Sequence, residues 1–473
     1  MTVASRRDPL PRRPQPQSPA GGVSTAAAER TGASILILFV VASVVLGDRA
    51  QLNVATGGRG VLPILQILAP LVALGTAARY GSRSSLGFVA LPVFLLGVVP
   101  YIAMTAVLPV AGVVFNGYPE RTLLSVGEAT TAVSFLVVGA ALSRVPAGSW
   151  SPWIVAAILI QLIYATAQAL FLAGGPGSEL FAPFHAWDLS YAGAADFVQQ
   201  RSSGLYLNPN ELGVWAGGAL IMALTLLRSV RRTVAVAGAL ATLLLSQSRG
   251  STIAVVAALF VMAAIALRRG GINRSGLATV ALLAAGAFVA LGAVVAVGPP
   301  GLLEDRFGGL VDVFVEGPRA EANLAGRLDY WSAVGVLNSL YPWGTGGSPE
   351  LLLGTAVDST WFRVFAQGAA PYVAALVLLL FVAVSMPGFT YRRPLVLLTV
   401  LLAVAGLTQT PFNYPIGYLF WVLLGAGLEA TYLARAARLE AGGRARSSRY
   451  YPGRRRDRTQ PASSDGRPFT SSR

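Results

Sequence analysis

Long apolar runs of about 14 to 23 residues recur between residues 34 and 434, and an α-helix needs about 20 such residues to cross a bilayer. Segments in hydrocarbon must be helical, because hydrocarbon offers no partners for free backbone groups. We predict an all-α, polytopic integral membrane protein with about 12 transmembrane helices. The predicted spans are residues 34–47, 60–78, 86–108, 122–142, 152–173, 210–227, 233–247, 251–267, 275–297, 361–384, 394–408 and 416–434.

The polar connections between these runs alternate in charge. All 36 residues counted as Lys or Arg are arginines, and most of them lie in both tails and in every second connection. Most acidic residues lie in the other connections. Because cytoplasmic loops carry the excess of basic residues, we predict that both termini are cytoplasmic. A chain rich in Ala, Gly and Arg and without Lys is typical of a GC-rich bacterial genome, which favours the plasma membrane of a bacterium.

This pattern predicts three parts. Residues 1–33 are rich in Pro and Arg and are predicted to be a disordered cytoplasmic tail, as is the Arg-rich segment 435–473. Between them lies a transmembrane domain, residues 34–434. Its largest connection, residues 298–360, is a predicted outer loop between the ninth and tenth helices. Long ordered loops tend to carry function.

The composition excludes several classes of protein. The chain is 54% hydrophobic and only 12% charged, whereas a soluble domain carries about 25% charged residues. The net charge of +15 suggests a nucleic-acid ligand, but the arginines lie beside apolar spans, so we expect no nucleic acid. There is no Cys, which excludes disulfides and thiol nucleophiles, and we predict no metal site and no cofactor.

One candidate site opens the sixth span. Asn208 suits a helix N-cap and Pro209 the first helical turn, and a helix N-terminus presents free N–H groups to an anion. Arg201 precedes this helix start and Asn210 lies in it. We expect Arg201, Asn208 and Asn210 to bind substrate; the alternative is an ordinary capped helix.

A second candidate is Arg249, in the tight turn Ser248-Arg249-Gly250 between two apolar runs. A charge between two apolar runs is costly unless it is hydrated or paired with an opposite charge. Such a costly charge favours a functional role for Arg249. The alternative is an arginine that snorkels to the lipid headgroups.

The large outer loop carries the third candidate. Arg327, Asp329 and Trp331 lie in a segment that reads as an amphipathic helix on the membrane surface, and a glycine cluster at residues 344–347 would allow close approach to a ligand. The alternative is a loop packed on the bundle, with Arg327 paired to Asp329.

Four further residues are possible members of a site. Asp358, just outside the tenth span, could act as a general base or could cap a helix. Arg363 follows it. Glu128 lies inside the fourth span, where an ionisable group is a functional candidate or a partner of an outer arginine. His185 is the single histidine, and in its aromatic setting packing is the commoner role.

Taken in order, Arg201…Gly204…Asn208-Pro209-Asn210, Ser248-Arg249-Gly250 and Gly326-Arg327…Trp331…Gly344…Gly346 resemble the motifs of the O-antigen ligase and polymerase superfamily. The resemblance covers about residues 150–410. It implies an inverting membrane glycosyltransferase that moves a glycan from an undecaprenyl-diphosphate carrier to a hydroxyl-bearing glycan, lipid or protein acceptor on the outer face, without metal.

By motif position, the resemblance implies that Arg201, Arg249 and Arg327 hold the diphosphate. Guanidinium forks suit this role, because they match phosphate oxygens bidentately and stabilise the charge that develops on the leaving group. Ligases of the family carry a histidine late in the large loop, and residues 298–360 contain none. Asp358 occupies roughly that place, so we predict Asp358 and Arg327 as catalytic. The alternative function is a transporter or flippase for lipid-linked sugars.

Overall fold

A computed structural model describes most of the chain. The described residues are 22–46, 54–55, 61–62, 64–81, 87–117, 124–172, 176–181, 201–206, 208–268, 317, 322–347, 349–353 and 357–450.

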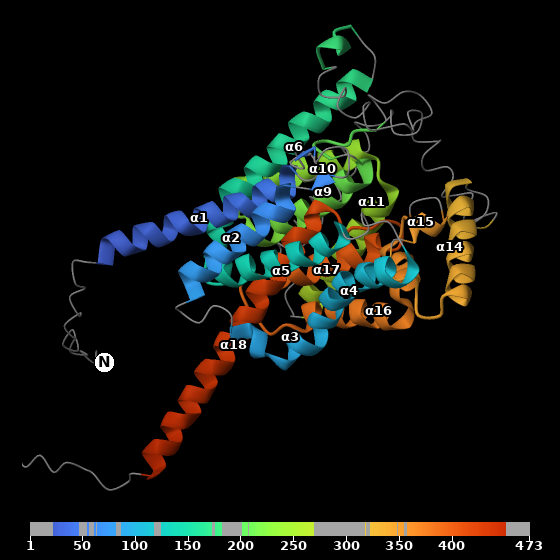
Figure 1. The fold of residues 1–473 in the computed structure, drawn as a ribbon. Coiled ribbons are helices and arrows are strands. Elements are labelled where there is room, and N and C mark those ends of the chain that lie inside the picture. Colours follow the sequence, from blue (N-terminus) through green and yellow to red (C-terminus); the bar gives the residue numbers. More distant parts are fainter. Residues whose placement is uncertain are drawn as a thin grey trace, which may run out of the picture.

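The described part is a bundle of helices (Figure 1) with one short hairpin of two-residue strands, β1 (Val54–Ala55) and antiparallel β2 (Val61–Leu62). The α-helices are α1 (Gly22–Leu46), α2 (Ile64–Gly81), α3 (Pro92–Gly97), α4 (Val99–Asn116), α5 (Leu124–Leu142), α6 (Ser151–Leu172), α9 (Pro209–Leu226), α10 (Ser229–Ser246), α11 (Arg249–Arg268), α14 (Ala322–Leu340), α15 (Glu350–Leu353), α16 (Thr360–Ser385), α17 (Arg392–Ala405) and α18 (Pro415–Tyr450). Short 3₁₀ helices are η2 (Gly87–Ala90), η4 (Ala147–Trp150) and η5 (Ser178–Phe181).

The fold is that of an α-helical membrane protein. Six helices in the described part are long and apolar enough to cross a bilayer. Every predicted span except the ninth overlaps helical residues, the third being divided between α3 and α4, and the ninth, residues 275–297, lies outside the described residues. Twelve membrane crossings remain a prediction.

Two helices extend beyond their predicted ends. α1 begins at Gly22, inside the predicted N-terminal tail, and α18 continues to Tyr450, where the sequence predicted disorder from residue 435. The extension of α18 is rich in Arg and Ala, which are good helix formers. Residues 435–450, which the sequence assigned to the disordered tail, are helical here, and the disorder of the tail remains a prediction.

Small residues set the packing at the centre of the bundle. A Cβ atom added at Gly139 of α5 would lie 2.1 Å from the carbonyl oxygen of Val422 in α18. One added at Gly425 of α18 would lie 2.1 Å from the oxygen of Leu136. The two helices thus touch backbone to backbone, as helices in membranes do at small residues.

Helix α16 is broken in its middle. Gly368 and Ala369 leave the helical conformation, and Ala369 has φ of 50°, a region that L-residues with side chains rarely adopt. The break is covered by the glycine cluster: Thr345 N donates to Ala366 O at 2.8 Å and Gly346 N to Gln367 O at 3.0 Å. The close approach predicted for these glycines is therefore to the α16 backbone.

The ends of the described chain lie apart from the outer-loop helix. In Figure 1 the start of α1 and the end of α18 lie on the left and lower left, and α14 lies on the far right. Which of these ends faces the cytoplasm remains a prediction from the arginine pattern.

Candidate functional site

The helix start predicted at Asn208 is confirmed. Asn208 is the N-cap of α9, with Pro209 in the first turn, and its side-chain oxygen accepts from Asn210 N at 2.8 Å. Capping removes one unsatisfied donor at this helix end. It also explains Asn208 without a ligand.

Two buried glutamines of α6 hold the loop that carries Arg201. Gln168 Oε1 accepts from the backbone N–H groups of Ser203 at 3.0 Å and Gly204 at 2.8 Å, and Gln161 Oε1 accepts from Leu205 N at 3.0 Å. Both glutamines are fully buried. Gly204 has φ of 63°, and an added Cβ atom would lie 2.5 Å from Gln161 Oε1, so the loop requires glycine there.

These glutamines were missed in the sequence. A signal was present, because two amides seven residues apart lie on one face of an apolar helix, and polar groups inside a span mark a contact that needs them.

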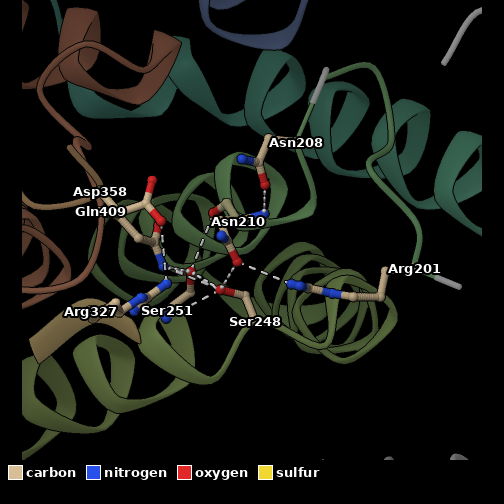
Figure 2. A network of polar contacts seen from close by, with 8 residues as sticks. All are labelled: Arg201, Asn208, Asn210, Ser248, Ser251, Arg327, Asp358 and Gln409. Carbon is tan, nitrogen blue, oxygen red and sulfur yellow. Dashed lines mark hydrogen bonds and ion pairs between the residues drawn. The ribbon is translucent and has the colours of Figure 1, made fainter. Parts of the chain in front are cut away.

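Arg201 is fixed by this loop at the meeting point of α9 and α10. Its Nε and Nη2 donate to Ser246 O at 3.1 and 3.0 Å, and Nη2 also donates to Asn210 Oδ1 at 3.0 Å. Figure 2 shows the guanidinium pointing at the Asn210 side chain. Arg201 and Asn210, predicted together as substrate-binding, are in direct contact.

Asn210 connects Arg201 to a hydroxyl cluster at the start of α11. Ser248 Oγ donates to Asn210 Oδ1 at 3.1 Å and lies 2.7 Å from Ser251 Oγ. Gln409, in the turn between α17 and α18, donates through Nε2 to Ser248 Oγ at 3.3 Å and Ser251 Oγ at 3.2 Å. We call Arg201, Asn210, Ser248, Ser251 and Gln409 the hydroxyl–amide network (Figure 2).

Gln409 was also missed in the sequence. The signal was the polar triplet Thr408-Gln409-Thr410 between two apolar runs. The Oε1 atom of Gln409 is buried without a hydrogen-bond partner among the described residues.

Arg249 is the first residue of α11 and directly follows Ser248 of the network. Its side chain is half-buried. Its neighbour Gly250 lies tightly against the Gln409 turn, because an added Cβ atom would lie 2.5 Å from Thr408 Oγ1 and 2.9 Å from Gln409 Nε2. The Ser248-Arg249-Gly250 turn is thus packed against the turn that joins α17 to α18.

Arg327 of α14 faces Asp358. Arg327 Nη2 lies 3.7 Å from Asp358 Oδ2, and the two side chains are 31% and 61% exposed. Partial desolvation raises the pKa of Asp358 above its ordinary value, and the charge of Arg327 opposes that rise. The ion pair corrects the expectation of an Arg327–Asp329 pair, and Asp329 lies exposed on α14.

Asp358 does not cap the helix that follows it. Ser359 is the N-cap of α16, and its hydroxyl accepts from Phe362 N at 3.4 Å. The capping alternative for Asp358 is therefore wrong, because the next residue takes that role.

The segments that carry Arg327 and Asp358 join the hydroxyl–amide network through the backbone. Thr360 donates to Gln409 O from its N–H at 2.9 Å and from its hydroxyl at 3.2 Å. In the view of Figure 2, Arg201 and Arg327 lie on opposite sides of the serines. That the three arginines line one hollow remains a prediction.

Glu128 and Arg363 line one cavity. It lies between α4, α5, α16 and the turn before α18, with a volume of about 20 Å³, enough for about one water molecule. Tyr101, Gln367 and Tyr372 also line it. The sequence suggested Glu128 and Arg363 separately, and the structure brings them together.

His185 lies outside the described residues. Within the described part of the chain, no group of three or more His, Cys, Asp or Glu side chains gathers as metal ligands would.

No protein-family model matches the chain, and no curated protein matches it. The resemblance to the O-antigen ligase and polymerase superfamily therefore remains a prediction from the motifs, and the function has to be argued from the geometry of the site.

Proposed function

We propose that this protein is an integral-membrane glycosyltransferase. It transfers a glycan from an undecaprenyl-diphosphate carrier to a hydroxyl-bearing glycan, lipid or protein acceptor, at the outer face of a bacterial plasma membrane and without metal. It belongs, on this proposal, with the O-antigen ligases and polymerases.

The observation that carries the proposal is the fixed position of Arg201. Two buried glutamines hold its loop, and Ser246 and Asn210 hold its guanidinium. A guanidinium that is held in a fixed position near the start of an apolar helix can bind an anionic ligand without rearranging first. A diphosphate between lipid and sugar is such a ligand.

Arg249 and Arg327 support the same proposal. Arg249 follows Ser248, which shares Asn210 with Arg201. Arg327 lies beside Asp358. Asp358 comes two residues before Thr360, whose N–H donates to the backbone oxygen of Gln409. As the glycosidic bond breaks, negative charge develops on the diphosphate, and guanidinium groups stabilise it bidentately.

The surface of α14 and of the turn after it suits a site at the membrane boundary. Val336 and Leu340 of α14 are 62% and 70% exposed, and Trp343, just after the helix, is 81% exposed. On its other side, Trp331 stacks on Phe362 of α16 with ring centroids 4.7 Å apart. A helix that packs on the bundle and exposes apolar side chains is suited to lie in the headgroup region.

The test is binding of undecaprenyl diphosphate to the full-length protein in lipid nanodiscs, measured by native mass spectrometry. Hydrogen bonds to charged groups contribute about 1.5–3 kcal/mol, so we expect Arg201→Ala to weaken binding by about 10- to 100-fold. Arg201→Lys should recover only part, because an ammonium lacks the planar fork.

The matched control is Arg268→Ala, at the opposite end of α11 and exposed, which should bind like the wild type. Undecaprenol, which lacks the diphosphate, should bind equally to all variants. Equal affinity of the wild type and Arg201→Ala for the diphosphate would contradict the proposal.

The second candidate is a carrier for lipid-linked sugars. The broken helix α16 and a cavity with ionisable side chains favour it, because transporters place their sites at broken helices. Proteoliposomes separate the two: a carrier moves fluorescent lipid-linked sugar across the bilayer without cleaving the glycan from its diphosphate, and a transferase cleaves it.

A further inference from the structure

A large open pocket lies at the ends of α9 and α10 that are remote from the hydroxyl–amide network. Its volume is about 850 Å³, and small-molecule sites occupy about 300–1,000 Å³. The turn from α9 to α10, residues 225–231, forms one wall. The other walls are formed by Ala147 and Gly148 of η4, Ser151 at the start of α6, and Thr390 in the turn before α17.

The pocket and the network are separated by the length of two helices. α9 begins beside Asn210 of the network and ends at Leu226, and α10 returns from Ser229 to Ser246, whose backbone oxygen holds Arg201. Each helix has 18 residues, which span about 27 Å at a rise of about 1.5 Å per residue. The hydrocarbon core of a bilayer is about 30 Å thick. With the network at one bilayer surface, the pocket therefore lies at the other.

The pocket is positively charged. Arg228 and Arg231 line it, and no described residue that lines it is Asp or Glu. The Arg231 guanidinium donates from Nη1 to the Ser151 hydroxyl at 3.4 Å, and in the described part of the chain no carboxylate forms an ion pair with either arginine. A guanidinium has five N–H donors, so most donors of both side chains remain for a ligand.

The start of α10 adds further donors to the same wall. Arg228 is the N-cap residue of α10, and its side chain makes no capping hydrogen bond. The N–H groups of the first helical turn therefore lack a side-chain acceptor at this position, and the positive end of the helix favours an anion. Ser229 and Thr390 bring hydroxyl groups to the pocket. Guanidinium, N–H and hydroxyl donors together suit the oxygens of a phosphate group.

Part of the pocket wall is apolar. Leu226, Leu227 and Val230 line it, and Val230 is 75% exposed. A ligand with an anionic head and an apolar tail would contact both parts of the wall. A basic connection is expected at a cytoplasmic membrane surface, but that tendency does not require its arginines to surround a pocket with an apolar side.

We propose that this pocket binds a phosphate ester, held by Arg228, Arg231 and the start of α10. Two sources share this chemistry, the headgroup of an anionic phospholipid and a soluble phosphorylated metabolite. The apolar part of the wall and the distance of one bilayer thickness from the network favour the phospholipid, because basic pockets at the cytoplasmic ends of helices suit anionic headgroups. The site does not depend on the proposed transfer reaction, because it shares no residue with the hydroxyl–amide network.

The test measures binding to the full-length protein in detergent by native mass spectrometry. The probes are phosphatidylglycerol, zwitterionic phosphatidylcholine and glycerol 3-phosphate. We expect Arg228→Gln/Arg231→Gln to bind phosphatidylglycerol about tenfold or more weakly than the wild type, because hydrogen bonds from charged groups are lost. Binding of phosphatidylcholine should not change.

The matched control is Arg268→Gln/Arg393→Gln. It removes the same amount of charge from exposed side chains at the ends of α11 and α17 that lie away from the network, and neither residue lines the pocket. We expect this variant to bind phosphatidylglycerol like the wild type. An equal loss in both double variants would show that only the overall charge of this surface matters, and would overturn the site.

Gly148 allows a second test that keeps both arginines. A Cβ atom added there would meet no atom within 4 Å, so a longer side chain should leave the fold intact. In Gly148→Glu a carboxylate enters the pocket and competes with the ligand for the guanidinium groups, whereas Gly148→Gln has the same size without the charge. We expect the larger loss of phosphatidylglycerol binding in Gly148→Glu, and equal losses would contradict an anion site.

The soluble probe distinguishes the two sources. If glycerol 3-phosphate binds and the arginine double variant loses it, while phosphatidylglycerol binds equally to both proteins, the phosphate ester comes from solution. If the wild type binds neither probe, or the double variant keeps wild-type affinity for both, the site is overturned. Neither result bears on the proposed function, which is tested by binding of undecaprenyl diphosphate to the Arg201 variants.

Discussion

Two regions of this protein bring a carboxylate and a guanidinium to one place, and they differ in their surroundings. Arg327 of α14 and Asp358 lie 3.7 Å apart, with Asp358 61% exposed. Glu128 and Arg363 line a cavity between helices, beside the buried side chains of Tyr101 and Tyr372. The residue types are similar, but water screens the first pair far more than the second.

The comparison bears on which carboxylate could act as the base. Asp358 is 61% exposed and lies beside Arg327, so water and a guanidinium both stabilise its charge. Glu128 is half-buried and faces a cavity with space for about one water molecule. A general base needs geometry first and a suitable pKa second, and of the two only Asp358 is open to an acceptor. We therefore keep Asp358 as our prediction for the base.

The largest expected difference between the regions is in stability. Glu128 and Arg363 are half-buried, and removing one of two opposite charges at such a place leaves the other poorly solvated, so we expect Arg363→Ala to lower the free energy of unfolding by about 2–4 kcal/mol. Arg327→Ala should cost less than about 1 kcal/mol, because exposed pairs contribute little. Thermal unfolding of both variants in one detergent measures this difference. Equal losses of stability would show that Glu128 and Arg363 are as well solvated as Arg327 and Asp358.

The next prediction compares two buried glutamines, Gln409 of the hydroxyl–amide network and Gln367 beside the cavity. Gln409→Leu leaves the Ser248 and Ser251 hydroxyls without their donor, and should cost about 1–3 kcal/mol. Gln367→Leu removes an amide without a protein partner among the described residues, and should change stability by less than about 0.5 kcal/mol. The same unfolding assay serves here, and a large loss in Gln367→Leu would mean that the amide supports the fold.

The smallest effect is a pH shift that tests Asp358 as the base. The charge of Arg327 lowers the pKa of Asp358, so Arg327→Ala raises that pKa. A base works only when ionised, so the fall in the transfer rate on acidification should begin at higher pH in the variant. An acid limb that stays in place would show that another group is the base.

Much of the fold was predictable from the sequence, for a physical reason. Hydrocarbon leaves a chain few choices, because apolar runs must be helical and their lengths must match the bilayer. In the described part of the chain, each predicted span therefore overlaps helical residues. The ends of helices were less predictable, because α18 continues to Tyr450, beyond the apolar run that predicted it.

The candidate site was predictable only in part. Local signals identified Asn208 as an N-cap and placed Arg201 near Asn210, because both depend on short stretches of chain. Gln168 and Gln409 escaped notice, because their partners are 35 and 161 residues away. A lone glutamine in an apolar run does not say which backbone it will satisfy.

The sequence by itself determined that this is a helical membrane protein and where its charges lie along the chain, because burial in lipid acts on each segment separately. Only the tertiary structure decided which charges meet. It paired Arg327 with Asp358 rather than Asp329, and it brought Glu128 of α5 and Arg363 of α16 to one cavity. Which charged side chains come together depends on how the helices pack, and packing is a property of the whole bundle.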